Sequence, residues 1–379
     1  MSFNLRFPKD SGFTKTEIRF YSDQPELTEL YSLTGQGPMR LFVTDTNIAE
    51  LEPLKKFAGL FTKESERVFS ARNGRDILLC LDPGEAYKDI DHVLAIVKVA
   101  LDHNFDRGAI FVAIGGGVIS DMTAFAASIF KRGVAVEFVP TTLLSMVDAA
   151  IGGKTGCDFE SYKNMIGAFY PAELLHVFPK FVQSLPQREY VSGLGEAVKT
   201  AFLFSPGMTE LLKTQKDLVL KRDEAILEKV IAECATAKAK IVHKDFKEKG
   251  ERAFLNLGHT FGHALESVAG LGTITHGEAV AWGMGRAIDL SLSKGLCTEQ
   301  FAKEAKDILS GYGYDMKSIP SVLTQNGTDA DLLAQKILDA MKKDKKNKAQ
   351  GSLRVILQKD IGKNLIQEVS EQEVLQVLK

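Results

Sequence analysis

Three of the seven histidines in this 379-residue chain fall within one short stretch, and their spacing indicates a possible metal site. His259 and His263 are four residues apart, so on a helix they lie one above the other on the same face. Asn256 is expected to cap that helix, which should run through Glu266. His276 follows a glycine-rich turn and could fold back beside them. Imidazole is the commonest metal ligand, so a zinc site is one interpretation and ordinary core or surface histidines are the other.

Further charged residues stand where they could act on a substrate. Glu196 and Lys199 are three residues apart in a helical pattern that begins at Gln187, so they share one helix face. Asp148 has apolar neighbours, where a carboxylate is usually paired or functional. Lys154 follows two glycines, as phosphate-binding lysines often do, although the P-loop spacing is absent. The alternatives are a surface ion pair on the helix and a structural ion pair for Asp148.

Short apolar runs in the first half predict the elements that would position such residues. The runs span residues 40–44, 76–81, 109–114 and 135–139. They are typical of buried parallel strands, and helical patterns separate several of them, so we expect a doubly wound α/β domain. Three glycines at 115–117 follow one strand and lead into a helix expected at 120–130, whose N–H groups could hold a pyrophosphate. The G-x-G-x-x-G fingerprint is absent, so a plain tight turn is the alternative.

Composition excludes several classes of protein. A hydrophobic content of 45% and a charged content of 25% are ordinary for a globular chain, and the length suits two domains. The net charge of −2 favours neither nucleic acid nor a membrane surface. We find no signal-peptide pattern and no apolar run of about 18 residues, so a cytoplasmic location is expected. Four widely separated cysteines predict reduced thiols.

Taken together, the motifs resemble the dehydroquinate synthase family of sugar-phosphate cyclases. The matches follow one another in order from about Asp45 to Gly362, and the number of ordered matches makes the resemblance specific. The main matching segments are Asp82-Pro83-Gly84-Glu85, Gly115-Gly116-Gly117, Lys131-Arg132-Gly133, Gly152-Gly153-Lys154-Thr155-Gly156, Gly195-Glu196-Ala197-Val198-Lys199, Leu255-Asn256-Leu257-Gly258-His259-Thr260-Phe261-Gly262-His263 and Asp344-Lys345-Lys346.

The resemblance implies a carbon–oxygen lyase of the shikimate pathway, which leads to the aromatic amino acids. It would convert 3-deoxy-D-arabino-heptulosonate 7-phosphate to 3-dehydroquinate and phosphate. The implied steps are transient oxidation by NAD⁺, β-elimination of phosphate, re-reduction and intramolecular aldol closure, with one divalent metal, zinc or cobalt. The implied fold is a Rossmann-like, doubly wound parallel-sheet domain that binds NAD over residues 1–185, and a mostly helical metal- and substrate-binding domain over 186–379. A homodimer is implied, with a small sugar-phosphate substrate and neither nucleic acid nor membrane as partner.

The resemblance also implies a role for each matching residue. The metal ligands should be Glu196, His259 and His276, which replaces the pair of His259 and His263 that spacing alone favours. The groups that act on the substrate ring and phosphate should be Asp148, Lys154, Lys199, Glu248, Asn256 and His263. The remaining substrate contacts should be Lys238 and Arg252 at the carboxylate, Asn164 and one of Lys345 and Lys346 at the phosphate, and Arg132 from the neighbouring subunit. NAD should meet Asp45, Asn47, Glu85, Lys88, Gly115, Gly116, Gly117, Asp121, Thr141, Thr142, Lys154, Lys163 and Ser184.

Some positions depart from the family pattern, and other functions stay open. The departures are Tyr162, His176, Thr200 and Phe246. They leave room for a cyclase with an altered substrate, although Lys154, Asn256 and His263 are kept. Two further alternatives are an NAD- and metal-dependent polyol dehydrogenase of the glycerol dehydrogenase type and a catalytically dead scaffold or metal-binding paralogue. Neither would need a set of cations for two anionic ends of a substrate.

Overall fold

The computed structural model describes residues 1–23, 26–52, 54–63, 70–160, 162–270, 272–325, 327–343 and 352–379. The chain divides into two units, and each has its own core. The first unit comprises Met1–Leu185 together with Lys238–Lys247, and the second comprises Pro186–Ala237 together with Glu248–Lys379.

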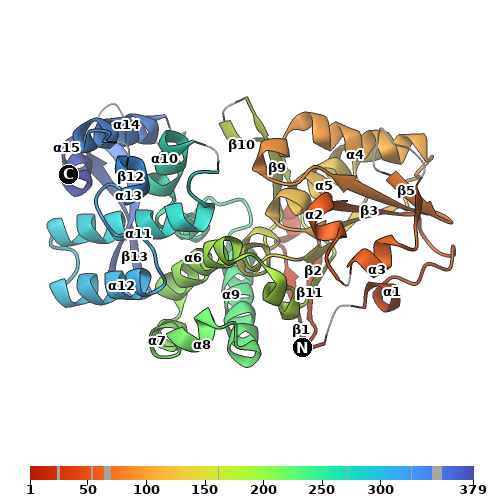
Figure 1. The fold of residues 1–379 in the computed structure, drawn as a ribbon, viewed down its shortest axis with the longest axis horizontal. Helices are drawn as coiled ribbons and strands as arrows, with labels where there is room; N and C mark the ends of the chain where they lie inside the picture. Colours follow the sequence, from red (N-terminus) through yellow and green to blue (C-terminus); the bar gives the residue numbers. More distant parts are fainter. Residues whose placement is uncertain are drawn as a thin grey trace. The chain divides into compact units, whose positions relative to one another are not determined.

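A mixed sheet forms the centre of the first unit (Figure 1). Over the described residues it has nine strands in the order β1-β2-β11-β8-β7-β3-β6-β5-β4. Their bounds are β1 Ser2–Arg6, β2 Lys15–Phe20, β3 Arg40–Asp45, β4 Thr62–Lys63, β5 Ser70–Asn73, β6 Asp76–Leu81, β7 Ile110–Gly115, β8 Ala135–Pro140 and β11 Leu174–Val177. The strands from β2 to β6 pair in parallel, and β1, β5 and β4 extend the sheet by antiparallel pairing. The four predicted strands are therefore confirmed as β3, β6, β7 and β8.

The strand order reverses next to β3, as in a doubly wound fold. From β3 the chain passes to β6 on one side and then returns to β7 on the other. In open α/β sheets ligands bind at such a switch point, outside the carboxyl ends of the strands. The other elements of this unit are α1 Leu27–Leu30, α2 Thr46–Ala49, α3 Leu54–Ala58, α4 Ile90–Asp102, α5 Gly117–Ile129, β9 Lys154–Phe159 and β10 Tyr162–Phe169. Helix α5 begins at the last of the three glycines, three residues earlier than predicted.

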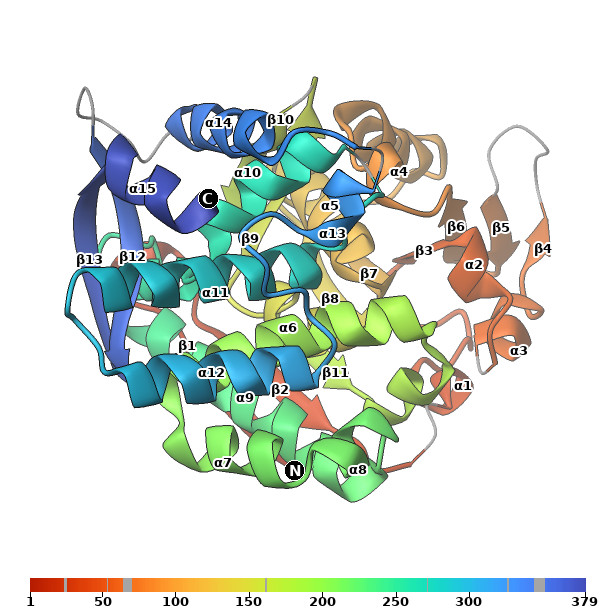
Figure 2. The same cartoon turned by 60° about the vertical axis from the view of Figure 1, so that its left-hand side comes forward.

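Helices make up most of the second unit, and an antiparallel hairpin of β12 and β13 lies near its end. The bounds are α6 Gln187–Phe204, α7 Pro206–Thr214, α8 Lys216–Leu220, α9 Glu224–Lys244, α10 His259–Ala269, α11 His276–Ser293, α12 Glu299–Gly311, α13 Ser321–Thr324, α14 Ala330–Lys342, β12 Ser352–Asp360, β13 Lys363–Ser370 and α15 Glu371–Leu378. The residues of α9 from Lys238 onward belong to the first unit. Figure 2 shows α11 with α10 on one side and α6 on the other, and α11 also contacts α12, α15 and β12. Because it is buried around most of its circumference, α11 is the core helix of this unit.

The predicted cap of α10 is wrong. The helix begins at His259, and Gly258 precedes it in a left-handed conformation with φ 78°. Asn256 lies in a separate 3-10 turn, Glu251–Asn256, and its side chain donates to the carboxylate of Glu248. The sequence pattern could not show this break, because it depends on the backbone angle at a glycine.

Two other predictions concern the whole chain. The structure describes all four cysteines, and each is a free thiol as predicted. Across the described segments we find no helix with the length and apolar character needed to cross a lipid bilayer.

Candidate active site

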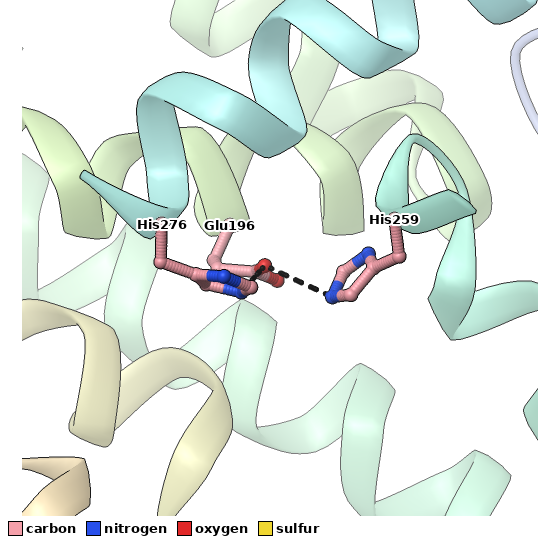
Figure 3. A group of neighbouring side chains, drawn as sticks. All are labelled: Glu196, His259 and His276. Atoms are coloured by element: carbon pink, nitrogen blue, oxygen red, sulfur yellow. Dashed lines mark ion pairs between the residues drawn. The ribbon is translucent and has the colours of Figure 1, made fainter. Parts of the chain in front are cut away.

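The three predicted metal ligands lie together in the second unit, each on a different helix (Figure 3). Glu196 belongs to α6, His259 is the first residue of α10 and His276 is the first residue of α11. Glu196 Oε1 lies 3.6 Å from His259 Nε2 and 3.3 Å from His276 Nε2. A tetrahedral ion with bonds of about 2 Å holds its ligand atoms about 3.3 Å apart, so this spacing suits one metal ion.

Close packing of α6 against α11 brings Glu196 beside His276. A Cβ atom on Gly195 would lie 2.4 Å from the carbonyl oxygen of Gly277, and one on Gly277 would lie 1.8 Å from that of Ser192. The backbone N–H of Gly277 also donates to Ser192 Oγ at 3.1 Å. Each glycine is the chain neighbour of a ligand, so the small side chains are needed where the ligands must converge.

Glycines also determine how α10 meets α11. A Cβ atom on Gly262 would lie 2.9 Å from the carbonyl oxygen of Ala279, and one on Gly283 would lie 2.1 Å from that of Gly258. Gly258 itself adopts the left-handed conformation, which only glycine enters without strain. Since His259 follows directly, its position depends on this contact between the two helices.

A capping box fixes the beginning of α11. The Thr275 hydroxyl accepts from the backbone N–H of Glu278 at 3.3 Å, and the Glu278 carboxylate accepts from the backbone N–H of Thr275 at 2.7 Å. This reciprocal pair satisfies N–H groups that have no partner within the helix. The backbone of His276, between the two, is held from both sides.

The electrostatics of the cluster favour the metal-binding forms of Glu196 and His259. Lys199 forms a buried ion pair with Glu196. Burial alone would raise the pKa of Glu196, but the charges of Lys199 and His276 outweigh it and lower that pKa to about 2. Burial, together with the charge of Lys199, lowers the pKa of His259 well below its usual value. Burial also opposes charge on His276, yet the adjacent carboxylates of Glu196 and Glu266 raise its pKa to about 9. Glu196 is therefore an anion and His259 is neutral, whereas His276 must release a proton when a metal binds.

The donor atoms themselves fit a divalent metal. Glu196 Oε1 is buried and has no hydrogen-bond partner among the residues that the structure describes. A buried carboxylate oxygen needs a partner, and an ion shared with two imidazole nitrogens would supply one. Two histidines and one glutamate, with a fourth position open, are a donor set known from catalytic zinc sites.

His263 lies beside the ligands but outside the group formed by Glu196, His259 and His276. It is one helical turn beyond His259 on α10, and the two ring centroids are 5.2 Å apart. Its ring is also stacked on that of His276 at 6.0 Å. This exposed imidazole could meet a substrate bound at the metal, which is the role the resemblance implies for it.

The segment before α10 carries three predicted substrate residues. Asn256 Nδ2 donates to Glu248 Oε1 and also to the carbonyl oxygen of Ala253 at 3.1 Å, so this amide is held in one orientation. Arg252 is 1% exposed. A guanidinium held inside a fold is suited to two-point recognition of a carboxylate.

Predicted nucleotide residues gather at the carboxyl ends of three strands in the first unit. Gly116 is the N-cap of α5 and has no side chain to cover the N–H groups of the first turn. Asp45 ends β3, accepts from the backbone N–H of Ile48 at 2.9 Å, and has its pKa raised by burial. Thr141 follows β8, and its Oγ1 is buried with no hydrogen-bond partner within the described segments. These donors and acceptors fit a dinucleotide bound at the switch point.

A buried lysine joins several further predicted residues. Lys88 Nζ donates to Asp121 Oδ2 and to Asn164 Oδ1, both at 2.7 Å. Burial alone would lower the pKa of Lys88, but the carboxylates of Asp121 and Glu85 raise it. Lys163 Nζ lies 3.6 Å from Glu85 Oε1. Residues predicted to meet NAD are thus connected to Asn164, which was predicted to meet the substrate.

Asp148 is paired, one of the two outcomes that its apolar surroundings suggested. Lys238 Nζ lies 2.8 Å from Asp148 Oδ1 and donates to the backbone carbonyl oxygen of Asp148 at 2.7 Å. Lys238 is 7% exposed. The cation assigned to the substrate carboxylate is therefore oriented by a carboxylate of the protein.

The structure also locates the other predicted residues of the first unit. Ser184 ends a 3-10 turn and donates to the carbonyl oxygen of Phe181 at 2.9 Å. The remaining placements are Asn47 in α2, Gly115 at the end of β7, Gly117 at the start of α5, Arg132 after α5, Thr142 after β8 and Lys154 at the start of β9. Lys345 and Lys346 lie outside the described residues. The roles predicted for all of these stay predictions.

Sequence reasoning missed one carboxylate of the cluster. Glu266 Oε2 lies 3.5 Å from His276 Nδ1, and the Glu266 side chain is 8% exposed. The sequence did contain one indication of this contact. Glu266 is seven residues after His259, which is about two helical turns, so the two side chains lie on the same helix face. The glycines between helices gave no such signal, because their contacts join segments far apart in the sequence.

Comparison with known proteins decides the family. The model described as 3-dehydroquinate synthase N-terminal matches residues 78–192, and that described as 3-dehydroquinate synthase C-terminal matches residues 193–347. The 3-dehydroquinate synthase of Francisella tularensis subsp. holarctica is 38% identical over 341 residues, which cover 89% of this chain and 89% of that protein. The chain belongs to the 3-dehydroquinate synthase family. The predicted family is confirmed, and so is its α/β fold.

Solved structures of related cyclases share this fold. A 2-deoxy-scyllo-inosose synthase complexed with carbaglucose-6-phosphate, NAD⁺ and Co²⁺ is 23% identical with a TM-score of 0.81, covering 100% of this chain and 99% of that chain. ValA, a 2-epi-5-epi-valiolone synthase from Streptomyces hygroscopicus with NAD⁺ and Zn²⁺ bound, is 25% identical with a TM-score of 0.79, covering 97% and 96%. The first likeness concerns the fold alone.

Two departures from the 3-dehydroquinate synthase pattern have local structural explanations. Phe246 is buried, and its ring centroid lies 5.0 Å from that of Phe7 and 5.3 Å from that of Phe169. His176 is 2% exposed and forms a hydrogen bond of 2.9 Å with the hydroxyl of Tyr21. Both residues therefore serve the core of the first unit in these contacts.

Proposed function

We propose that this chain eliminates phosphate from 3-deoxy-D-arabino-heptulosonate 7-phosphate and closes the ring to give 3-dehydroquinate. The observation that carries the proposal is the convergence of Glu196, His259 and His276 in a chain 38% identical to a 3-dehydroquinate synthase. The reaction breaks a carbon–oxygen bond without hydrolysis, so the enzyme would be a lyase.

Two groups would be bound for this reaction. Glu196, His259 and His276 would hold a divalent metal, zinc or cobalt, and the residues at the strand ends of the first unit would hold NAD⁺. When bound, these groups supply polarisation of a substrate hydroxyl and reversible uptake of its hydride. The valiolone synthase relative solved with NAD⁺ and Zn²⁺ bound supports this assignment.

Cationic side chains and one amide would hold the two anionic ends of the substrate. Lys238 and Arg252 are assigned to the carboxylate, whereas Lys154 and Asn164 are assigned to the phosphate. Binding at both anionic ends selects one conformer of the substrate. It also holds the reacting atoms of the substrate near one another through every step. The two contacts of Lys238 to Asp148 support this role, because they fix the direction of the ammonium.

Polar groups near the metal ligands would handle protons and hydroxyls. His263 is exposed next to the cluster and is assigned to the phosphate end of the substrate, where an imidazole can donate or accept a proton. Asn256 would contact the substrate in the orientation that Glu248 gives its amide. Lys199 would contact a ring hydroxyl while it balances the charge of Glu196.

Assembly and location complete the proposal. We assign a homodimer in which Arg132 reaches the site of the neighbouring subunit, on the strength of the matching Lys131-Arg132-Gly133 segment. A cytoplasmic location stays a prediction from composition. The oligomer can be tested by light scattering and by mixing Arg132→Ala with Glu196→Ala subunits, which should restore part of the activity if sites are shared.

The experiment that tests the reaction follows phosphate and NADH together. With Zn²⁺ or Co²⁺ and NAD⁺, the chain should release one phosphate per heptulosonate phosphate consumed, with no net NADH. Glu196→Ala should abolish the release, and its persistence would contradict the assigned site. NADH that accumulates with glycerol, without phosphate release, would favour the polyol dehydrogenase alternative instead.

Substrate choice separates the proposal from a sister cyclase. The inosose synthase relative was solved with carbaglucose-6-phosphate, which has no carboxylate. A site built around Lys238 and Arg252 should therefore turn over the heptulosonate phosphate and leave glucose 6-phosphate unchanged. Faster phosphate release from glucose 6-phosphate would contradict the assignment.

A further inference from the structure

The His276 ring lies between two carboxylates, and one of them has no part in the metal site described above. His276 Nε2 is 3.3 Å from Glu196 Oε1, and Nδ1 is 3.5 Å from Glu266 Oε2. With a side chain only 8% exposed, Glu266 lies within the fold. Burying a carboxylate is unfavourable without a donor or cation nearby, and the imidazole Nδ1–H is such a donor.

The other histidine of the site has the same arrangement. His259 Nε2 lies 3.6 Å from Glu196 Oε1, and its Nδ1 lies 3.2 Å from the backbone carbonyl oxygen of Leu257. A carbonyl oxygen only accepts, so the Nδ1 atom carries the proton and the Nε2 lone pair faces Glu196. A carboxylate opposite Nδ1 of His276 selects the same tautomer for the second ring.

The helix that supplies His259 also supplies Glu266. The two residues are seven apart on α10, so their side chains leave the same face two turns from each other. Helix α10 packs on α11 through Gly262 and Gly283, and His276 begins α11. The distance between Glu266 and His276 is therefore determined by the packing of two rigid elements.

We propose that Glu266 is a positioning residue of the metal site, which accepts the Nδ1–H of His276 and so presents Nε2 to the metal. The inference rests on the metal site of the proposed function. A carboxylate behind a metal-bound histidine fixes its tautomer and ring orientation and makes the nitrogen a stronger donor. Loss of such a partner typically weakens metal binding about 10–100-fold.

A second cation site is the competing explanation for this carboxylate. His263, Glu266 and His276 also have ligand atoms within 4.8 Å of one another. In that arrangement His276 Nδ1 would have to bind a cation, which it cannot do while it carries the proton that leaves Nε2 available to the first metal. The positioning role is consistent with the orientation of both rings, and the second cation becomes an outcome of the test.

The test compares the wild type with Glu266→Ala, Glu266→Gln and the control Glu304→Gln. Glu304 lies on α12, is half exposed and pairs with Lys213, so the control makes the same chemical change at the surface. Each protein is stripped of metal, and its dissociation constant for Zn²⁺ is measured by competition with a chromophoric chelator. We expect Glu266→Ala to bind Zn²⁺ about 10–100-fold more weakly and Glu304→Gln to match the wild type. Glu266→Gln should lose less, because its amide oxygen still accepts from Nδ1–H.

Unfolding of the metal-free proteins separates positioning from general damage. The proposal requires metal-free Glu266→Gln to unfold at the wild-type temperature while its affinity for Zn²⁺ is reduced. Unchanged affinity in Glu266→Ala would overturn the role of Glu266. A wild type that binds two zinc ions, of which Glu266→Gln loses only the weaker, would overturn it as well. A wild type without affinity for Zn²⁺ would instead contradict the metal site of the proposed function.

Discussion

The substitution Gly277→Ala should separate α6 from α11 and move His276 away from Glu196. A Cβ atom at this position would lie 1.8 Å from the carbonyl oxygen of Ser192, and a flexible side chain cannot relieve the contact because the opposing atom is backbone. The helices would have to separate by more than about 1 Å, and overpacking of this kind costs about 1–3 kcal/mol of stability. A displacement of about 1 Å at a reacting centre can lower the rate about 100-fold.

Gly207→Ala is the matched control. Gly207 is the second residue of α7, and a Cβ atom there would meet nothing within 4 Å. The same chemical change should therefore be neutral or should stabilise the protein by about 0.4–1 kcal/mol, because alanine restricts the unfolded chain.

Urea unfolding and metal binding are measured for both variants. We expect Gly277→Ala to unfold at lower urea and to bind Zn²⁺ more weakly, and Gly207→Ala to do neither. If Gly277→Ala matched the wild type in both measurements, the close approach of α6 and α11 would not be what positions the ligands.

Three further predictions follow from individual contacts. His276→Ala should lose bound metal and phosphate release together, and full metal content by elemental analysis would refute its role as a ligand. Arg252→Ala should lower kcat/KM for the heptulosonate phosphate more than about 30-fold, while turnover of an analogue without the carboxylate is spared; equal losses for both would be inconsistent with carboxylate recognition. A hydrogen bond from Lys294 lowers the pKa of Glu373, at the start of α15, to about 2. The stability from this contact is complete above the usual pKa of 4.5 and is lost as pH falls toward 2, so Glu373→Gln should flatten acid unfolding in that window. An unchanged acid-unfolding curve would argue against it.

The sheet of the first unit was predictable from local pattern. The runs that became β3, β6, β7 and β8 are continuous and apolar because central parallel strands are buried on both faces. Their order in the sheet was not contained in that pattern, since it depends on contacts between strands distant in the chain. The class of fold therefore followed from the sequence, whereas the switch point beside β3 had to be observed.

The candidate site was predicted only in part. Residue spacing alone favoured His259 and His263 as the metal ligands, because spacing shows only which residues are neighbours on one helix. It carries no information about Glu196, which lies on another helix. The family resemblance supplied the set of Glu196, His259 and His276. The predicted cap at Asn256 was wrong because a left-handed glycine, Gly258, starts the helix later.

The contacts between helices that position the ligands could not be predicted from a single sequence. Gly195 and Gly277 matter because their backbones touch, although they are far apart in the chain. Glu266 matters because packing places it behind His276. Both are contacts between helices, and only a three-dimensional structure shows them.

One divalent ion should be held by the carboxylate of Glu196 on α6 and by the imidazoles of His259 and His276, the first residues of α10 and α11. Anomalous scattering at the zinc absorption edge, from a crystal grown with Zn²⁺ and NAD⁺, tests it most directly. We expect a peak about 2.0–2.2 Å from a Glu196 carboxylate oxygen, His259 Nε2 and His276 Nε2. A peak bound by His263 and Glu266 in their place, or no peak near Glu196, would contradict it.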